Sequence, residues 1–169
     1  VTGRSYKPFD YVGAPDAEHV IVAMGSVCET AEETVNALLK QGRKIGLIKV
    51  RLYRPFSAKH FMNVLPETCK KLAVLDRTKE PGSTGEPLLL DVRSVLYGRE
   101  GAPIVIGGRY GLASKDTKPG DIIAVYDNLA AEISKNDFTI GIVDDVTMKS
   151  LTEVHGISTE PEGTISCKF

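Results

Sequence analysis

The stretch AVLDRTKEPGSTGEPLLLDV, residues 73–92, decides the fold. It begins as an unbroken apolar run, passes through two prolines and two glycines, and ends in apolar residues at helical spacing. Unbroken apolar runs are typical of strands buried on both faces, and apolar residues every three or four positions indicate an amphipathic helix. The stretch therefore predicts a strand, a loop and a helix, which is the repeating unit of a parallel α/β sheet.

The same alternation recurs along the chain. Unbroken apolar runs indicate five strands, at residues 20–25, 45–50, 72–76, 104–108 and 138–143. Helical spacing is found at residues 31–39, 88–96 and 122–133, the last ending in Ile133, and a shorter helix is expected after Ser57. Ser26 and Glu29 have the spacing of a capping box, in which each side chain bonds one free backbone N–H at a helix start.

These elements predict a three-layer αβα fold of the α/β class. The sheet is expected to be mostly parallel and five-stranded, with helices on both faces joined by right-handed crossovers. Residues 20–150 form the expected domain. Residues 1–19, which are rich in proline and glycine, are expected to be an inter-domain linker, and residues 151–169 a second linker.

Composition argues against two classes of partner. The 169 residues carry 21 Lys and Arg against 22 Asp and Glu, so a net charge of −1 provides no field that attracts nucleic acid or anionic lipid. No apolar run approaches the roughly 20 residues that a membrane-spanning helix needs. Cys28, Cys69 and Cys167 are too far apart for a CxxC pair, and their odd number disfavours a disulfide framework. We expect a reducing, intracellular setting, and a chain without an initiating Met is expected to be part of something longer.

Ligands of open α/β sheets bind outside the carboxyl ends of the strands. That rule selects five loops, at residues 25–28, 51–57, 76–86, 107–118 and 144–149. The loop at 76–86 is not a P-loop, because Gly85 is followed by Glu86 rather than by Lys and a hydroxyl residue. A GxGxxG dinucleotide fingerprint is also missing from the sequence.

The loop at 76–86 still holds candidates for an interface or an anion site. They are Arg77, Thr78, Glu80, Gly82, Ser83 and Glu86. Arginine matches a carboxylate or a phosphate bidentately, so this loop could hold a small anion or a partner's loop. The alternative is a solvated loop with local ion pairs, which is favoured for Lys79 and the glutamates and stays open for Arg77.

The second candidate is GGRYGLASKD, residues 107–116. Gly107 and Gly108 permit a close approach to the backbone, and Arg109 beside Tyr110 suits recognition of a carboxylate or a protein surface. The alternative is a glycine-allowed turn with Tyr110 packed in the core.

We assign no catalytic, cofactor-binding or metal-binding residue. Asp144 and Asp145 could share a metal or a proton, but a helix-capping Asp beside a solvated one is favoured. The three histidines lack a neighbouring nucleophile pattern and are interpreted as ordinary surface residues. Cys28 lies near a helix start, where a thiol pKa can fall, but an inert core residue is the favoured interpretation.

Taken together, these stretches resemble the pyruvate:ferredoxin or pyruvate:flavodoxin oxidoreductases, and within them core domain II, which is transketolase C-terminal-like. The resemblance covers essentially the whole chain. Its hallmark segments are FDYVGAPDAEHVIVAMGSVCETAEETV, KIGLIKVRLYRPF, AVLDRTKEPGSTGEPL, GGRYGLASKD and FTIGIVDDVT. Leu89 and Ala113 stand where the family pattern leads us to expect Tyr and Ser.

The resemblance implies an anaerobic, homodimeric enzyme that oxidatively decarboxylates pyruvate to acetyl-CoA. It also implies thiamine diphosphate with magnesium, iron–sulfur clusters, coenzyme A, and ferredoxin or flavodoxin as electron acceptor. The sheet should then have one antiparallel edge strand, and the enzyme should be cytoplasmic, or hydrogenosomal in an anaerobic eukaryote. The chain lacks cysteine clusters and a GDG segment with its following Asn, so we expect no cofactor in this fragment and no catalysis by it.

Two functional hypotheses follow. The first is an organising domain that contacts other domains of the same polypeptide and the second subunit of the homodimer. Arg77 and Glu80 would make charge-assisted bonds across that contact, and Arg77→Ala or Arg109→Ala would weaken assembly or activity while the isolated domain stays folded. The second is a small-anion or regulatory ligand-binding domain, with the anion held by Ser26, Arg77 and Arg109.

Overall fold

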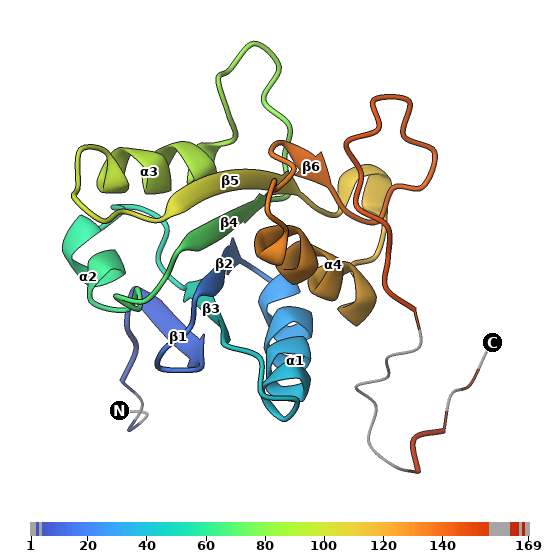
Figure 1. Cartoon of the computed structure of the whole chain (residues 1–169), viewed down its shortest axis with the longest axis horizontal. Helices are drawn as coiled ribbons and strands as arrows, with labels where there is room; N and C mark the ends of the chain where they lie inside the picture. Colours follow the sequence, from blue (N-terminus) through green and yellow to red (C-terminus); the bar gives the residue numbers. More distant parts are fainter. Residues whose placement is uncertain (1–2, 4, 156–162, 166, 168–169) are drawn as a thin grey trace.

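The computed structural model describes residues 3, 5–155, 163–165 and 167. Its centre is a six-stranded sheet in the order β1-β3-β2-β4-β5-β6, with helices on both faces (Figure 1). The strands are β1 (Phe9–Gly13), β2 (His19–Met24), β3 (Ile45–Val50), β4 (Lys71–Asp76), β5 (Ile104–Arg109) and β6 (Phe138–Thr139). All neighbouring strands are parallel except β1 and β3. The predicted α/β class, the mostly parallel sheet and the antiparallel edge strand are therefore confirmed.

The antiparallel edge strand is β1, which lies inside the segment expected to be a linker. Its residues pair with β3 from Phe9 opposite Val50 to Gly13 opposite Gly46. The Phe9 ring is buried and makes edge-on contacts with the Phe56 and Phe61 rings, whose centroids lie at 5.2 and 5.6 Å. The sheet consequently has six strands rather than five, because a half-buried edge strand does not appear in the sequence as an unbroken apolar run.

Within residues 5–155, four helices and one 3₁₀ turn connect the strands. They are α1 (Val27–Leu39), α2 (Ala58–Met62), α3 (Pro87–Leu96), α4 (Pro119–Ala130) and the turn η1 (Leu112–Ser114). Helices α1 and α4 pack on the sheet face that carries Ile21, Leu47 and Leu75. Helix α3 and Phe61 of α2 pack on the opposite face. Burial on both faces explains why the central strands are apolar throughout.

Three local predictions are corrected by the structure. Ser26 begins α1 but makes no side-chain capping bond, because its backbone is already helical (φ −64°, ψ −27°). Helix α4 ends at Ala130, so Ile133 lies outside it and is exposed. The chain leaves the helix because Asn128 bonds both the N–H and the C=O of Lys135. The expected strand at 138–143 contains only Phe138–Thr139, since the chain turns at Gly141 (φ +77°).

The first part of the second expected linker packs on the domain. Leu151 donates its N–H to the Thr139 carbonyl at 2.9 Å, and Val154 donates to the Gly120 carbonyl at 3.2 Å. A side chain at residue 120 would overlap the Val154 carbonyl, so this contact is close. Residues 156–162, 166, 168 and 169 of that expected linker lie outside the described residues.

The strand order creates a topological switch point between β2 and β4. These strands are neighbours, yet the helix after β2 packs on one face of the sheet and the helix after β4 packs on the other. The loops that leave them diverge and open a crevice at the carboxyl edge of the sheet, where ligands of such folds bind. Among the described residues, no helix is both long and apolar enough to cross a bilayer.

Candidate functional site at the carboxyl edge of the sheet

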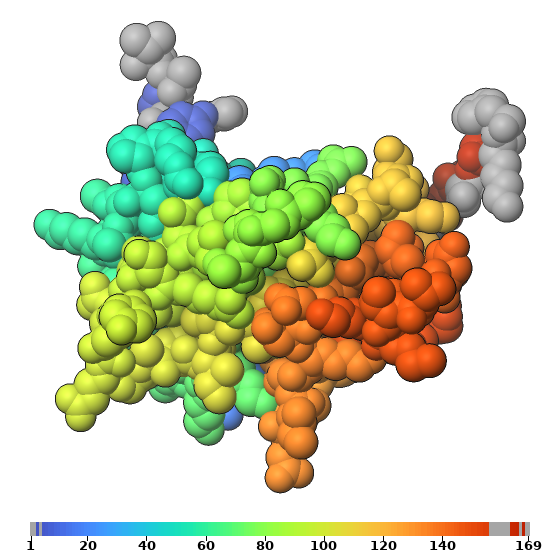
Figure 2. Space-filling view, turned by 90° about the horizontal axis from the view of Figure 1, so that it is seen from above, coloured from blue at the N-terminus to red at the C-terminus, as the bar shows by residue number. Residues whose placement is uncertain are grey.

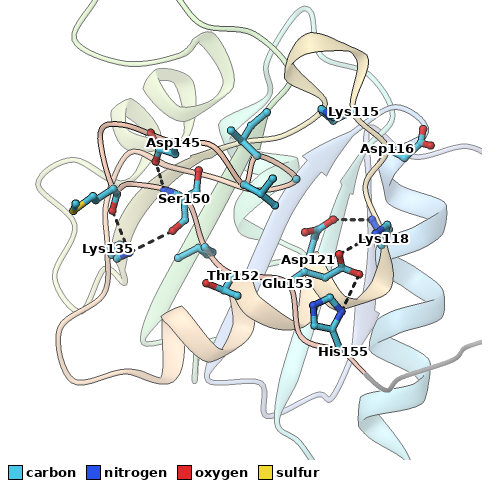
Figure 3. A pocket seen from close by; sticks show the side chains of 15 residues that line it. Lys115, Asp116, Lys118, Asp121, Lys135, Asp145, Ser150, Thr152, Glu153 and His155 are labelled. Carbon is cyan, nitrogen blue, oxygen red and sulfur yellow. Dashed lines mark hydrogen bonds and ion pairs between the residues drawn. The ribbon is translucent and has the colours of Figure 1, made fainter.

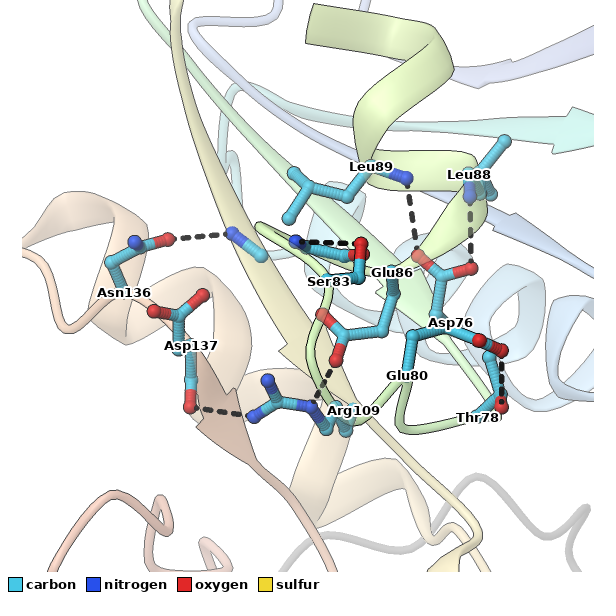
Figure 4. A network of polar contacts seen from close by, with 12 residues as sticks. Asp76, Thr78, Glu80, Ser83, Glu86, Leu88, Leu89, Arg109, Asn136 and Asp137 are labelled. Carbon is cyan, nitrogen blue, oxygen red and sulfur yellow. Dashed lines mark hydrogen bonds and ion pairs between the residues drawn. The ribbon is translucent and has the colours of Figure 1, made fainter.

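Asp76, the last residue of β4, holds the start of α3 (Figure 4). Its buried carboxylate accepts the backbone N–H groups of Leu88 and Leu89, each at 3.1 Å. The side chain of Glu86, the residue that precedes the helix, makes no such bond. Burial raises the pKa of Asp76, and the two N–H bonds oppose that rise. Asp76 was not among the predicted site residues. The sequence feature that could have indicated it is a carboxylate at the end of an otherwise apolar strand.

Glu86 and Arg109 form a buried ion pair beside this cap (Figure 4). Arg109 Nε lies 2.6 Å from Glu86 Oε1, and the side chains are only 16% and 4% exposed. Arg109 also donates through Nη1 to the Asp137 carbonyl at 3.1 Å. The carboxylate that Arg109 recognises therefore belongs to its own chain, and the pair ties the loop at 76–86 to β5 and β6.

Gly107 and Gly108 provide space for side chains of the core. A side chain at residue 108 would overlap the Phe138 ring and lie 2.9 Å from Leu75, and one at residue 107 would lie 2.5 Å from Leu89. These glycines thus allow packing by apolar side chains of this chain. Tyr110 is buried and donates its hydroxyl to the Met24 carbonyl at 3.0 Å, which agrees with the core alternative for that residue.

The tip of the loop at 76–86 extends away from the sheet (Figure 1). Its bonds are local: Thr78 donates to Glu80 at 3.3 Å, and Ser83 donates to the Gly85 carbonyl at 2.8 Å. Gly82 stands in the left-handed region at φ +81°. A contact between this tip and a partner stays a prediction.

Ser26 and Arg77, by contrast, come together at the topological switch point. Both line a cavity of about 290 Å³ between the loops that follow β2, β4 and β5. Arg109, the third residue of the predicted anion site, does not line it. Lys115, which was not singled out from the sequence, does. The sequence feature that could have indicated Lys115 is its position in the segment GGRYGLASKD, which follows the end of a predicted strand.

A larger hollow, of about 650 Å³, lies between the start of α4 and the segment around residues 141–155 (Figure 3). Lys118 and Asp121 have partners there: Lys118 Nζ lies 2.9 Å from Glu153, and the buried Asp121 carboxylate accepts the Lys118 backbone N–H at 3.0 Å. Burial raises the pKa of Asp121. Among the described residues, no group of three His, Cys, Asp or Glu side chains is arranged to hold a metal ion.

Asp145 organises the loop at the rim of this hollow (Figure 3). Its carboxylate accepts the N–H groups of Thr147, Lys149 and Ser150 at 2.6–2.9 Å, and the Thr147 hydroxyl at 2.5 Å. These bonds lower the pKa of Asp145. The expected helix cap is wrong, because Asp145 caps a turn. This turn presents three apolar side chains to solvent: Val143, Val146 and Met148 are 96%, 95% and 83% exposed. We call residues 143–148 the apolar loop; Figure 2 shows this region, in orange, at the surface.

The cysteines and histidines form no nucleophilic site within the described part of the chain. Cys28 and Cys69 are buried, and desolvation raises their thiol pKa values to about 11 and about 12. The inert interpretation of Cys28 is thereby supported, because the thiolate is the reactive form. His60 shares a 2.7 Å contact with Ser57 at the start of α2, and His19 is half-buried at the start of β2.

Fold and site together define a doubly wound α/β domain whose carboxyl edge carries an internal ion-pair network. The family model for pyruvate:ferredoxin oxidoreductase core domain II matches residues 17–122, and the chain belongs to this family. The chain is 61% identical over 169 residues to a pyruvate:ferredoxin oxidoreductase of Moorella thermoacetica, covering all of this chain and 14% of the relative. It is 54% identical over 170 residues to a pyruvate-flavodoxin oxidoreductase of Enterobacter agglomerans, with the same coverage.

The chain thus spans 14% of the length of these curated relatives. A solved 2-oxoglutarate:ferredoxin oxidoreductase from Magnetococcus marinus matches with a TM-score of 0.53. That match has 21% sequence identity and covers 72% of this chain and 19% of the other. At this identity the likeness shows the fold alone.

Proposed function

We propose that this chain is an organising domain of a pyruvate:ferredoxin (flavodoxin) oxidoreductase. The enzyme would oxidatively decarboxylate pyruvate to acetyl-CoA and transfer electrons to ferredoxin or flavodoxin. Support comes from identities of 61% and 54% that extend over the full chain while covering 14% of each relative. The partners would be the other domains of the same polypeptide and the second subunit of a homodimer, in the cytoplasm.

The cofactors implied for the whole enzyme do not fit the described residues of this chain. An iron–sulfur cluster requires several convergent cysteine thiolates, whereas Cys28 and Cys69 are each buried with raised thiol pKa values. A magnesium ion with thiamine diphosphate requires oxygen ligands, and the described residues hold no group of three His, Cys, Asp or Glu side chains arranged around a metal site. We therefore propose that other domains hold the thiamine diphosphate, magnesium and iron–sulfur clusters, and that catalysis takes place on those domains.

The observation that carries the proposal is the apolar loop. Three large apolar side chains within six residues are almost fully exposed, which costs solvation free energy unless another surface covers them. Hydrogen bonds also constrain the backbone of the loop, because Asp145 accepts three backbone N–H groups and Lys135 donates to the carbonyls of Met148 and Ser150. A preorganised apolar surface is suited to binding another domain, since little conformational entropy is lost on contact.

The test is Val146→Asp in the full-length enzyme, with Val146→Ile as the matched control. The Val146 side chain is 95% exposed, so neither change should alter the folding of this domain. We expect Val146→Asp to weaken subunit assembly, measured by analytical ultracentrifugation, and to reduce pyruvate-dependent reduction of ferredoxin or flavodoxin. Val146→Ile should match the wild type in both measurements. Wild-type assembly and activity in Val146→Asp would refute the proposal.

A further inference from the structure

The cavity at the topological switch point is lined by two exposed cations, Arg77 and Lys115, and by one exposed carboxylate, Asp116. We propose that it is a binding site for a small phosphoryl anion of phosphate or diphosphate size. Its polar lining comes from three separate loops and the first turn of α1: Ser26, Thr30, Arg77, Lys115, Asp116 and Thr117. This proposal is independent of the proposed organising role, because it concerns what the domain binds by itself.

The two cations of the cavity have no partner among the described residues. Neither Arg77 nor Lys115 makes an ion pair or a side-chain hydrogen bond there, whereas Arg109 and Lys118 nearby are both paired with carboxylates. Two cations that line one cavity repel each other, and the single carboxylate in this lining, Asp116, offsets only one of them. An anion between them would remove that repulsion and satisfy their N–H donors.

The backbone positions Arg77 at the cavity wall. Gly111 adopts φ +63°, and a β-carbon there would lie 2.9 Å from Arg77 Nε and 3.3 and 3.4 Å from its Cγ and Cδ. The stem of Arg77 therefore lies directly against the backbone at residue 111. This packing reduces the conformational freedom of the side chain, and its planar fork suits two oxygens of one phosphoryl group.

Hydroxyl groups complete the set of donors. Ser26 and Thr30 are four residues apart, so both lie on the same side of α1, and Thr117 reaches the cavity from the loop after β5. The Ser26 hydroxyl makes no capping bond and is free to donate to a ligand. The start of α1 adds a weak positive potential in the same direction, but the cations and the cavity carry the proposal.

The chemistry favours a phosphoryl anion over a cation or an apolar ligand. Two cations face one carboxylate, Asp116, so the lining keeps a net positive charge. A volume of about 290 Å³ lies at the lower end for small-molecule pockets, which fits phosphate, diphosphate or the diphosphate end of a nucleotide. Asp116 should weaken binding, because it faces the same cavity with the wrong sign.

The experiment is a two-dimensional amide NMR titration of the 169-residue chain with inorganic phosphate, pyrophosphate and ADP in separate series. We expect saturable shifts centred on Ser26, Val27, Gly111 and Lys115. Saturation by phosphate and pyrophosphate alone would assign a free anion, and tighter binding of ADP would assign a phosphorylated small molecule. Either pattern supports the site.

The variants are Arg77→Gln, Lys115→Gln and Asp116→Asn, with Lys79→Gln as the matched control. Lys79 is an exposed cation of the same loop as Arg77 but does not line the cavity. We expect Arg77→Gln to weaken binding about tenfold or more, and Asp116→Asn to tighten it. Lys79→Gln should change affinity less than about twofold, because a distant exposed charge is screened.

Several results would overturn the proposal. One is a dispersed spectrum with no saturable shift in any of the three titrations. Another is an equal loss of affinity in Lys79→Gln and Arg77→Gln, which would mean non-specific charge attraction. Unchanged or weaker anion binding by Asp116→Asn would also contradict the proposal, because this variant removes a negative charge from the cavity and leaves both cations in place. Wild-type assembly of the Val146→Asp enzyme would refute the organising role but would not change any of these binding results. The two proposals can therefore fail separately.

Discussion

Removing Arg109 should destabilise the domain itself, because its partner Glu86 would remain buried without a counter-charge. The Arg109 Nε to Glu86 Oε1 distance is 2.6 Å, and only 4% of the Glu86 side chain is exposed. Breaking a buried pair by removing one partner costs about 3–5 kcal/mol, which is a large part of a typical stability of about 5–15 kcal/mol. The sequence led us to expect a domain that stays folded without Arg109; this geometry changes that expectation.

The assay is a double-mutant cycle read by urea unfolding of the chain, followed by circular dichroism. We expect Arg109→Met to lower the unfolding midpoint by about 1 M urea or more. Glu86→Gln should cost less, about 1–2 kcal/mol, because the Gln carbonyl can still accept the Arg109 N–H. Arg109→Met should then cost much less in the Glu86→Gln background, giving a coupling free energy of at least about 1.5 kcal/mol.

The control for this cycle is the exposed pair of Lys70 and Glu18, which lie 2.9 Å apart with side chains 67% and 39% exposed. Lys70→Met should change the free energy of unfolding by less than about 1 kcal/mol, because exposed ion pairs contribute little. The reasoning would be refuted if Arg109→Met cost no more than Lys70→Met. Additive effects of the two changes at Glu86 and Arg109 would refute it equally.

Three further predictions concern single residues. Asp76→Ala leaves two N–H groups at the start of α3 without their acceptor and should cost about 2 kcal/mol or more in urea unfolding. Burial raises the pKa of Asp76 above 3.8, so ionising this carboxyl group is harder in the folded than in the unfolded chain. The free energy of unfolding of the wild type, relative to that of Asp76→Asn, should therefore fall as the pH rises from 3.8 through the raised pKa. Gly108→Ala should cost about 1–3 kcal/mol by overlap with the Phe138 ring, and adding Phe138→Leu should restore part of that loss. Asp145→Asn should speed amide exchange at residues 147, 149 and 150, whereas the wild type should keep its protection until the pH falls well below 3.8, since the pKa of Asp145 is lowered.

The four central strands could be predicted from sequence because burial on both faces leaves a strong local pattern. The run at 45–50 coincides with β3, and the run at 72–76 differs from β4 by a single residue. Strand β1 is only half-buried from Asp10 to Gly13 and pairs with a strand more than thirty residues away, so its five residues show no such run. The end of α4 depends on Asn128 bonding to Lys135, a tertiary detail that helical spacing does not contain.

The site was predictable only in part, for a related reason. The rule for carboxyl ends of parallel strands selected five loops, and two residues from those loops, Ser26 and Arg77, line one cavity. Arg109 does not line this cavity, because its guanidinium pairs with Glu86 instead. That pairing depends on the strand register, which aligns Arg109 of β5 with Asp76 of β4 and cannot be read from sequence patterns. Lys115 joins the cavity through a backbone turn with positive φ at Ala113 and Ser114, which sequence patterns do not predict.

The measurement that tests the organising role most directly is hydroxyl-radical footprinting of Met148, read by mass spectrometry. The Met148 side chain is 83% exposed in this chain, whereas Met24 and Met62 are half-buried and serve as internal references. We predict rapid oxidation of Met148 in the isolated chain and strong protection in the full-length enzyme, with both references unchanged. Equal oxidation of Met148 in the two samples would mean that no other domain covers the apolar loop, and would contradict the account.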